Sequence, residues 1–167
     1  MIRAIFLDVD GTLISFSTHE IPASALRALA QAHERGVRLF IATGRAANDL
    51  GPLEGIPYDG VVSLNGARCV ANDGRVVSLH PIPRADFERA LALSEEQGFA
   101  MGLELEEGVF VNRVTPDVER VAHMVAHPVP EQTDLRELFG RVECCQLCFY
   151  FDAETQRRVM AELPTLA

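Results

Sequence analysis

Three apolar runs in the first 65 residues are separated by polar segments that contain glycine. Each run has the length of a strand buried on both faces, and the runs are residues 3–8, 37–42 and 60–64. Residues 23–35 carry apolar side chains at helical spacing, and Gly36 is a typical helix stop. Residues 43–51 are predicted to form a second, short helix. Alternating strands and helices predict an α/β fold with a parallel sheet.

The pattern changes after residue 66. Residues 67–71 and 75–79 are β-rich runs that flank Asn72-Asp73-Gly74, which is a hairpin signal. His80-Pro81-Ile82-Pro83 is typical of a boundary between domains. We therefore expect one domain over residues 1–80 and another over residues 84–167.

The second half of the chain is predicted to be α+β, with strands that are only half buried. Helices are expected at residues 86–97, 116–126, 135–139 and 154–163. Strands are expected at residues 100–105, 109–112 and 142–151.

Composition and charge limit the kinds of molecule that this protein is expected to bind. The net charge is −9 and there is no basic stripe, which argues against nucleic acid and anionic membranes. No apolar run is long enough to span a bilayer. Asp8 and Asp10 end the N-terminal apolar run before a signal-peptide core forms. We expect a cytoplasmic protein with a small, diffusible partner.

Two carboxylates, Asp8 and Asp10, stand where the first predicted strand ends. Close carboxylates repel each other, and a cation such as Mg²⁺ relieves the repulsion. One of them can attack phosphorus, while the other protonates the leaving oxygen and then activates water. Gly11 lets a substrate approach the backbone, and Thr12 offers a hydroxyl and an N–H to phosphate oxygens. The alternative is that the acids only cap a turn.

Thr43 follows the second predicted strand and should reach the same sheet edge as Asp8. The helix expected there would offer free N–H groups to an anion, although an N-cap role alone is the alternative. Gly44 permits close approach of a phosphate. Arg45 either contacts substrate or lies on the helix surface. Asn65, at the end of the third strand, either touches substrate or only shapes the turn.

Cys145 and Cys148 form a C-x-x-C pair, and a zinc site would need a second pair such as His123 and His127. The favoured interpretation is that these cysteines pack as small apolar residues in the strand predicted over 142–151.

The acidic motif and the loop after the second strand resemble those of the haloacid dehalogenase (HAD) superfamily, in its Cof-like phosphatase branch. The matching segments are Asp8-Val9-Asp10-Gly11-Thr12, Ala42-Thr43-Gly44-Arg45 and Ser63-Leu64-Asn65-Gly66-Ala67. The resemblance implies a Rossmann-like parallel-sheet core and an inserted α+β cap, both incomplete here. It also implies an Mg²⁺-dependent phosphatase acting on a small phosphorylated metabolite, with a sugar phosphate expected.

The resemblance assigns roles by position. Asp8 would be the nucleophile that carries an aspartyl phosphate, and a magnesium ligand. Asp10 would be the general acid/base, with its backbone carbonyl on the metal. The residues implied to bind phosphate or substrate are Thr12, Thr43, Gly44, Arg45 and Asn65. A cap would close over the site and select the leaving group. A phosphomutase or another phosphotransferase would use the same residues.

The sequence departs from the family in two motifs. The family's Lys has no counterpart, because all 15 Lys+Arg residues are Arg, and its late acidic loop is absent. We therefore expect a fragment, a shortened product or one piece of a split protein that is weak or inactive as a phosphatase alone.

A non-catalytic binding module is the alternative. A receiver domain would need an Asp where Asn65 stands. An incomplete sheet would leave an edge open to self-association.

Overall fold

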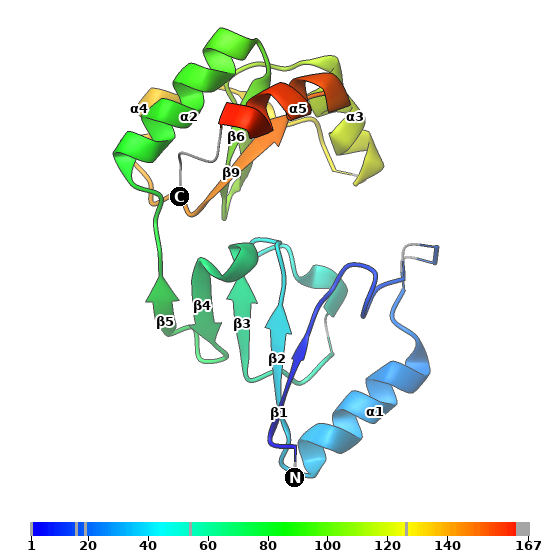
Figure 1. Cartoon of the computed structure of the whole chain (residues 1–167). Helices are drawn as coiled ribbons and strands as arrows, with labels where there is room; N and C mark the ends of the chain where they lie inside the picture. The colour runs from blue at the N-terminus through cyan, green and yellow to red at the C-terminus, as the bar shows by residue number, and fades with distance from the viewer. Residues whose placement is uncertain (1, 16, 19, 54, 126, 163–167) are drawn as a thin grey trace. The chain divides into compact units, whose positions relative to one another are not determined.

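The computed structural model describes residues 2–15, 17–18, 20–53, 55–125 and 127–162. The chain divides into two compact units, Met1–His80 and Pro81–Ala167, each with its own sheet (Figure 1). Within the described residues, no helix is both long and apolar enough to cross a bilayer.

Unit 1 is built on a mixed five-stranded sheet whose strands follow one another in chain order. They are β1 (Ala4–Leu7), β2 (Arg38–Ala42), β3 (Gly60–Ser63), β4 (Arg68–Ala71) and β5 (Val76–Leu79). The first three are parallel, whereas β4 and β5 form the expected hairpin and extend the same sheet in antiparallel pairing. The α/β fold class predicted from the sequence is confirmed, with the hairpin as an addition to the parallel sheet.

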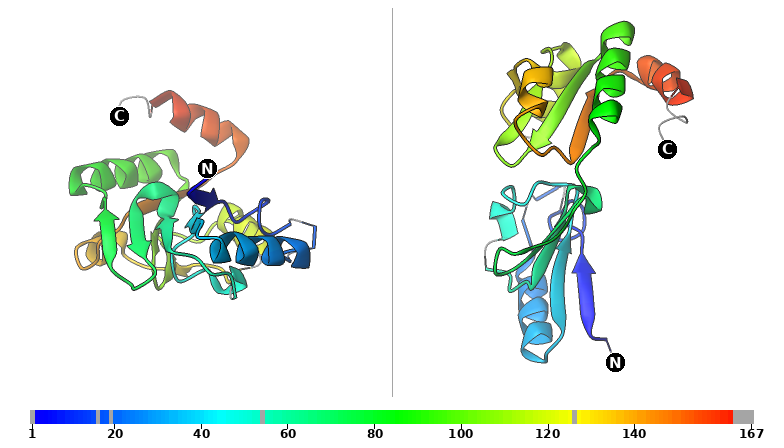
Figure 2. Two further views of the ribbon diagram at one scale, coloured as in Figure 1. Left: turned by 90° about the horizontal axis from the view of Figure 1, so that it is seen from below. Right: turned by 90° about the vertical axis from the view of Figure 1, so that its left-hand side faces the viewer.

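Helix α1 (Ala23–Glu34) runs along one face of this sheet (Figure 2). Its buried Leu29 packs in a core with Leu39 and Ile41, both 0% exposed. Side chains alternate along a strand, so the intervening Phe40 points to the other face. There it stacks on Phe6 of β1 with ring centroids 4.9 Å apart, and Phe6 remains 62% exposed. The face that carries Phe6 is therefore open to solvent at this point.

The segment after β2 is not the short helix predicted for residues 43–51. It consists of bends and turns, followed by one 3₁₀ turn, η1 (Gly51–Leu53). The Thr43 hydroxyl oxygen accepts the N–H of Arg45 at 3.1 Å, and such side-chain bonds compete with helical ones. The segment is also rich in poor helix formers, namely Gly44, Asn48 and Asp49. A stretch this short cannot offset the cost of helix nucleation.

Unit 2 has a four-stranded sheet in the order β8-β7-β6-β9. The strands are β6 (Ala100–Leu105), β7 (Gly108–Val111), β8 (Glu131–Gln132) and β9 (Gln146–Tyr150). The helices are α2 (Arg84–Gln97), α3 (Pro116–Met124), α4 (Leu135–Phe139) and α5 (Ala153–Glu162). Strand β9 is shorter than the run 142–151 predicted from the sequence. Cys144 lies before the start of β9. Its carbonyl accepts the N–H of Ile82 at 2.8 Å, so Cys144 is bound to the segment that precedes α2 instead.

Strand β6 is buried on both faces, which corrects the expectation of half-buried strands. On one face, Met101 and Leu103 are 0% exposed and belong to a core with Phe87 of α2. On the other face, Ala100 packs in a second core with Val118 of α3. The strand lacks the polar outer face assumed from the sequence because helices cover both sides.

Candidate active site

The carboxyl ends of β1, β2 and β3 meet at one edge of the unit 1 sheet. Leu7 of β1 pairs with Ile41 of β2, and the N–H of Thr43 donates to the carbonyl of Val62 in β3 at 2.9 Å. Asp8 comes directly after β1. Open α/β sheets place their ligands at this edge.

A hollow of about 290 Å³ opens at this edge. Its lining is formed by Asp8, Ala42, Thr43, Gly44, Val62, Asn65 and Gly66. Thr43 is buried, whereas Asp8 and Asn65 are exposed. The structure thus brings together four of the residues predicted for the site, Asp8, Thr43, Gly44 and Asn65, while Asp10, Thr12 and Arg45 are not part of this lining.

The loop that carries the two acids is anchored by the apolar residues around them. Val9, Leu13 and Ile14 are 1%, 6% and 7% exposed. The carbonyl of Val9 accepts the N–H groups of Leu13 and Ile14 at 3.0 and 2.9 Å. In this compact loop the side chains of Asp8 and Thr12 are exposed. The Thr12 hydroxyl donates to Asp8 Oδ2 at 2.9 Å. One oxygen of the candidate nucleophile is thereby held in place.

Arg45 neither lies on a helix nor faces the hollow, because its guanidinium group is bound to acids. Nε and Nη2 donate to Asp10 Oδ2 and Oδ1 at 2.9 and 2.8 Å, which is a bidentate pair. Nη1 donates to Asp49 Oδ2 and to its backbone carbonyl, both at 3.2 Å. The hydrogen bond from Arg45 lowers the pKa of Asp10, and the same bond raises the pKa of Arg45. Sequence reasoning missed Asp49, for which an acid four residues after the arginine was the available signal.

The turn after β3 is built from left-handed residues. Leu64, Asn65 and Gly66 have φ values of 49°, 54° and 96°. Such a conformation costs a non-glycine residue roughly 1–2 kcal/mol. Two bonds to the loop after β2 hold it, because the N–H groups of Leu64 and Asn65 donate to the carbonyls of Arg45 and Thr43 at 3.1 and 3.2 Å. Backbone strain of this kind gathers at binding sites.

The oxygen donors at this edge are of the kind that Mg²⁺ takes. Mg²⁺ uses one or two protein carboxylates and completes its shell with water or phosphate, and Asp8 offers such a carboxylate. Both carboxylate oxygens of Asp10 accept from Arg45, so a contact from Asp10 would come from its backbone carbonyl. Among the described residues there is no group of three or more His, Cys, Asp or Glu side chains placed to hold a metal ion.

The cysteine pair considered for zinc lies in a different setting. Burial, followed by the nearby Glu104 carboxylate, raises the pKa of Cys148 to about 12. Its thiol donates to Glu104 Oε2 at 3.5 Å. Zinc binds the thiolate, so a thiol held in its protonated form is a poor ligand.

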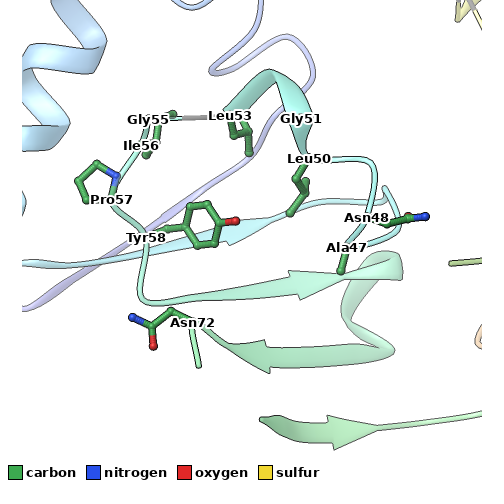
Figure 3. A pocket seen from close by; sticks show the side chains of 10 residues that line it. All are labelled: Ala47, Asn48, Leu50, Gly51, Leu53, Gly55, Ile56, Pro57, Tyr58 and Asn72. Carbon is green, nitrogen blue, oxygen red and sulfur yellow. The ribbon is translucent and has the colours of Figure 1, made fainter. Parts of the chain in front are cut away.

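A larger hollow of about 580 Å³ lies along the loop between β2 and β3 (Figure 3). The ring of Tyr58 projects into it between Leu50 and Ile56. Its other polar lining residues are Asn48 and Asn72, and its described lining contains no carboxylate. It therefore offers no carboxylate that could attack phosphorus.

Comparison with known proteins identifies the family. A model of the haloacid dehalogenase-like hydrolases matches residues 5–167. The protein YkrA from Bacillus subtilis is 30% identical over 95 residues, which is 56% of this chain and 36% of YkrA.

Solved structures agree with this match. The HAD phosphatase BT1666 from Bacteroides thetaiotaomicron is 53% identical, with a TM-score of 0.91 over 98% of this chain and 61% of its own. The HAD subclass IIB sugar phosphatase BT4131 is 29% identical, with a TM-score of 0.82 over 98% of this chain and 64% of its own. The chain thus spans about three fifths of these solved relatives. Taken together with the fold, the match of the family model over nearly the whole chain means that this protein belongs to the haloacid dehalogenase-like hydrolases.

Proposed function

We propose that this chain carries the nucleophile and the phosphate-binding loops of an Mg²⁺-dependent phosphatase that hydrolyses a small phosphomonoester. The observation that carries the proposal is the hollow shared by the Asp8 carboxylate, the buried Thr43 and Asn65. A sugar phosphate is the expected substrate class, and the similarity to the sugar phosphatase BT4131 supports it.

In this proposal, the oxygen of Asp8 that Thr12 does not hold attacks the phosphorus atom. An Asp8–phosphorus bond forms while the bond from phosphorus to the leaving oxygen breaks, and Asp10 gives that oxygen a proton, which Asp10 takes up when its bidentate pair with Arg45 opens. Asp10 then takes a proton from water, whose oxygen attacks phosphorus and releases phosphate from Asp8. Mg²⁺, held by the Asp8 carboxylate and the Asp10 carbonyl, would neutralise charge on the phosphoryl group.

Thr43 and Gly44 serve the phosphoryl group in this scheme. The Thr43 hydroxyl oxygen already accepts the N–H of Arg45, so its own hydrogen is left to donate to a phosphoryl oxygen. Gly44 has no side chain to obstruct the approach. We further propose that residues 84–167 form the cap that selects the leaving group.

Binding of a phosphoryl mimic tests the proposal without relying on turnover. Orthovanadate with Mg²⁺ should raise the melting temperature of the chain, because a ligand that binds only the folded state stabilises it. Asp8→Asn should abolish the rise. Asp73→Asn makes the same charge change in the β4–β5 turn, where the Asp73 carboxylate accepts the N–H of Arg75, and should leave the rise intact.

Two results would overturn the proposal, an Asp8→Asn variant that responds like the wild type and a response that does not need Mg²⁺. Phosphate release from p-nitrophenyl phosphate is measured on the same samples. We expect slow release, because no Lys is present to neutralise the phosphoryl group. A rate typical of the family would contradict that expectation.

A further inference from the structure

Arg45 bridges two acids that lie on different loops of unit 1. All three guanidinium nitrogens donate, Nε and Nη2 to Asp10 and Nη1 to Asp49. The Arg45 side chain is 22% exposed, compared with 44% for Asp10 and 38% for Asp49. The Arg45 side chain is thus the most buried member of the bridge, and partial burial strengthens charge-assisted bonds.

Asp49 is itself fixed by the turn in which it lies. Its N–H donates to the carbonyl of Ala46 at 3.1 Å. Ala46 and Leu50, on either side of it, are 5% and 8% exposed and anchor the turn in the core. Asp49 also presents two acceptors to Nη1, its carboxylate and its carbonyl. An ordinary surface ion pair has one flexible contact, whereas this one adds a contact from the anchored backbone of Asp49 to the contact from its carboxylate.

The geometry points to Asp49 as a positioning residue for Asp10, acting through Arg45. The inference rests on the proposed function, in which Asp10 moves the proton. Asp49 holds one arm of the guanidinium group, so that the remaining Nε and Nη2 pair keeps a fixed direction towards the Asp10 carboxylate. Without Asp49, the group can swing with its flexible stem, and Asp10 loses a partner of fixed direction. Small displacements of a catalytic group reduce rates substantially.

Restricted motion of the guanidinium group gives a direct readout. In protein labelled with ¹⁵N-arginine, the Nη protons of Arg45 should give separate signals, because bonds to both acids hinder rotation of the group. Arg45→Lys assigns those signals by their loss. Asp49→Ala should merge the two Nη1 proton signals, because Nη1 loses its partner, whereas the Nη2 protons stay bound to Asp10, and Asp49→Glu should restore part of the Nη1 separation. Asp117→Ala, which removes a half-buried acid paired with Arg120 in unit 2, is the matched control and should leave the Arg45 signals unchanged.

An Asp49→Ala variant whose Arg45 signals remain those of the wild type would overturn the inference. So would equal merging in the Asp117→Ala control. In turnover, Asp49→Ala should lower kcat about tenfold with KM unchanged, which is part of the 10²–10⁴-fold that a general acid contributes. A change in KM alone would also contradict it. Failure of the proposed function would be seen in a different measurement, because the melting temperature of the Asp8→Asn variant would still rise with vanadate.

Discussion

The carboxamide of Asn65 lies against the α-carbon of Gly44, where a side-chain carbon would come within 3.2 Å of Asn65 Oδ1. Gly44→Ala should therefore push the carboxamide aside, destabilise the protein by about 1 kcal/mol and weaken the response to vanadate and Mg²⁺. Thermal melts with and without these ligands measure both effects.

Gly51 in the same loop is the matched control for that substitution. A side-chain carbon there meets no atom within 4 Å. Gly51→Ala should be neutral or stabilise by about 0.4–1 kcal/mol, through a less flexible unfolded chain. Adding Asn65→Ala to Gly44→Ala should recover part of the lost stability, because the two residues are in contact. Additive losses would show that the contact is unimportant.

Substitutions at Asn65 separate its backbone role from its side-chain role. Asn65→Val should destabilise by roughly 1–2 kcal/mol, because a β-branched residue tolerates the left-handed conformation poorly. Asn65→Gly should keep the turn and the stability. If the carboxamide contacts the phosphoryl group, Asn65→Gly still loses the vanadate response. A retained response would leave Asn65 as a turn residue only, and denaturation curves together with ligand melts distinguish these outcomes.

The bond from Thr12 to Asp8 should matter for binding more than for stability. Both residues are exposed, so loss of the bond in Thr12→Val should cost less than about 1 kcal/mol of unfolding free energy. The freed carboxylate should bind vanadate and Mg²⁺ more weakly. Thr12→Ser keeps the hydroxyl and should behave as the wild type. Equal binding by the valine and serine variants would contradict the role given to the hydroxyl group.

Alkaline pH should destabilise unit 2 through two of its thiols, the buried Cys144 and the partly buried Cys148. Burial raises the pKa of Cys144 to about 11 and that of Cys148 to about 12. An unfolded thiol titrates near 8.5, so above that pH the unfolded chain loses protons that the folded chain retains. The contribution of the two protonated thiols to the free energy of unfolding is complete below about pH 8.5. It is lost as the pH rises towards the folded pKa values.

Urea denaturation at pH 7.5 and pH 10 measures this loss, which should reach about 2 kcal/mol for each thiol. In Cys148→Ala, the free energy of unfolding should decline less between these two pH values. Between pH 6.5 and 7.5, both proteins should hold their stability, because the thiols are protonated in the folded and unfolded states alike. A decline of the same size in Cys148→Ala would assign the effect to other groups.

We propose that the chain associates with itself through the edge strand β1. Among the described strands, β1 has a neighbour on one side only, and Phe6 on it is 62% exposed. Light scattering should therefore show a mass that rises with concentration, and Phe6→Lys should reduce the rise. Val77→Lys changes a residue that is 60% exposed on β5, at the other edge, and should have no effect. A monomer at all concentrations would contradict the proposal.

The strands of unit 1 along the chain and the edge where the polar residues gather could be predicted because they follow from local patterns. Asp8 and Thr43 each follow a continuous apolar run, and parallel strands bring such positions together. The Asp10–Arg45 pair could not be predicted, because it joins residues 35 positions apart whose approach depends on the loop after β2. That loop was predicted as a helix, since hydrophobic pattern does not weigh a hydroxyl group that competes for a backbone N–H.

The positive φ of Leu64 was also beyond prediction. Leucine has no preference for that conformation, which is imposed here by bonds to a neighbouring loop. The Asn65-Gly66 turn itself carried a local signal, because both residue types tolerate the left-handed region.

The strands of unit 1 lie in the sheet in the same order as in the chain. During synthesis, each strand therefore finds its neighbour already made, and no later segment has to be inserted between earlier ones. The lining of the hollow ends at Gly66, so we expect the pocket to assemble while most of unit 2 is still untranslated. Unit 2 differs, because its central strand β6 must wait for β9. A ribosome paused once residues 1–80 have left its exit tunnel should already present the pocket-bearing half of the protein in folded form.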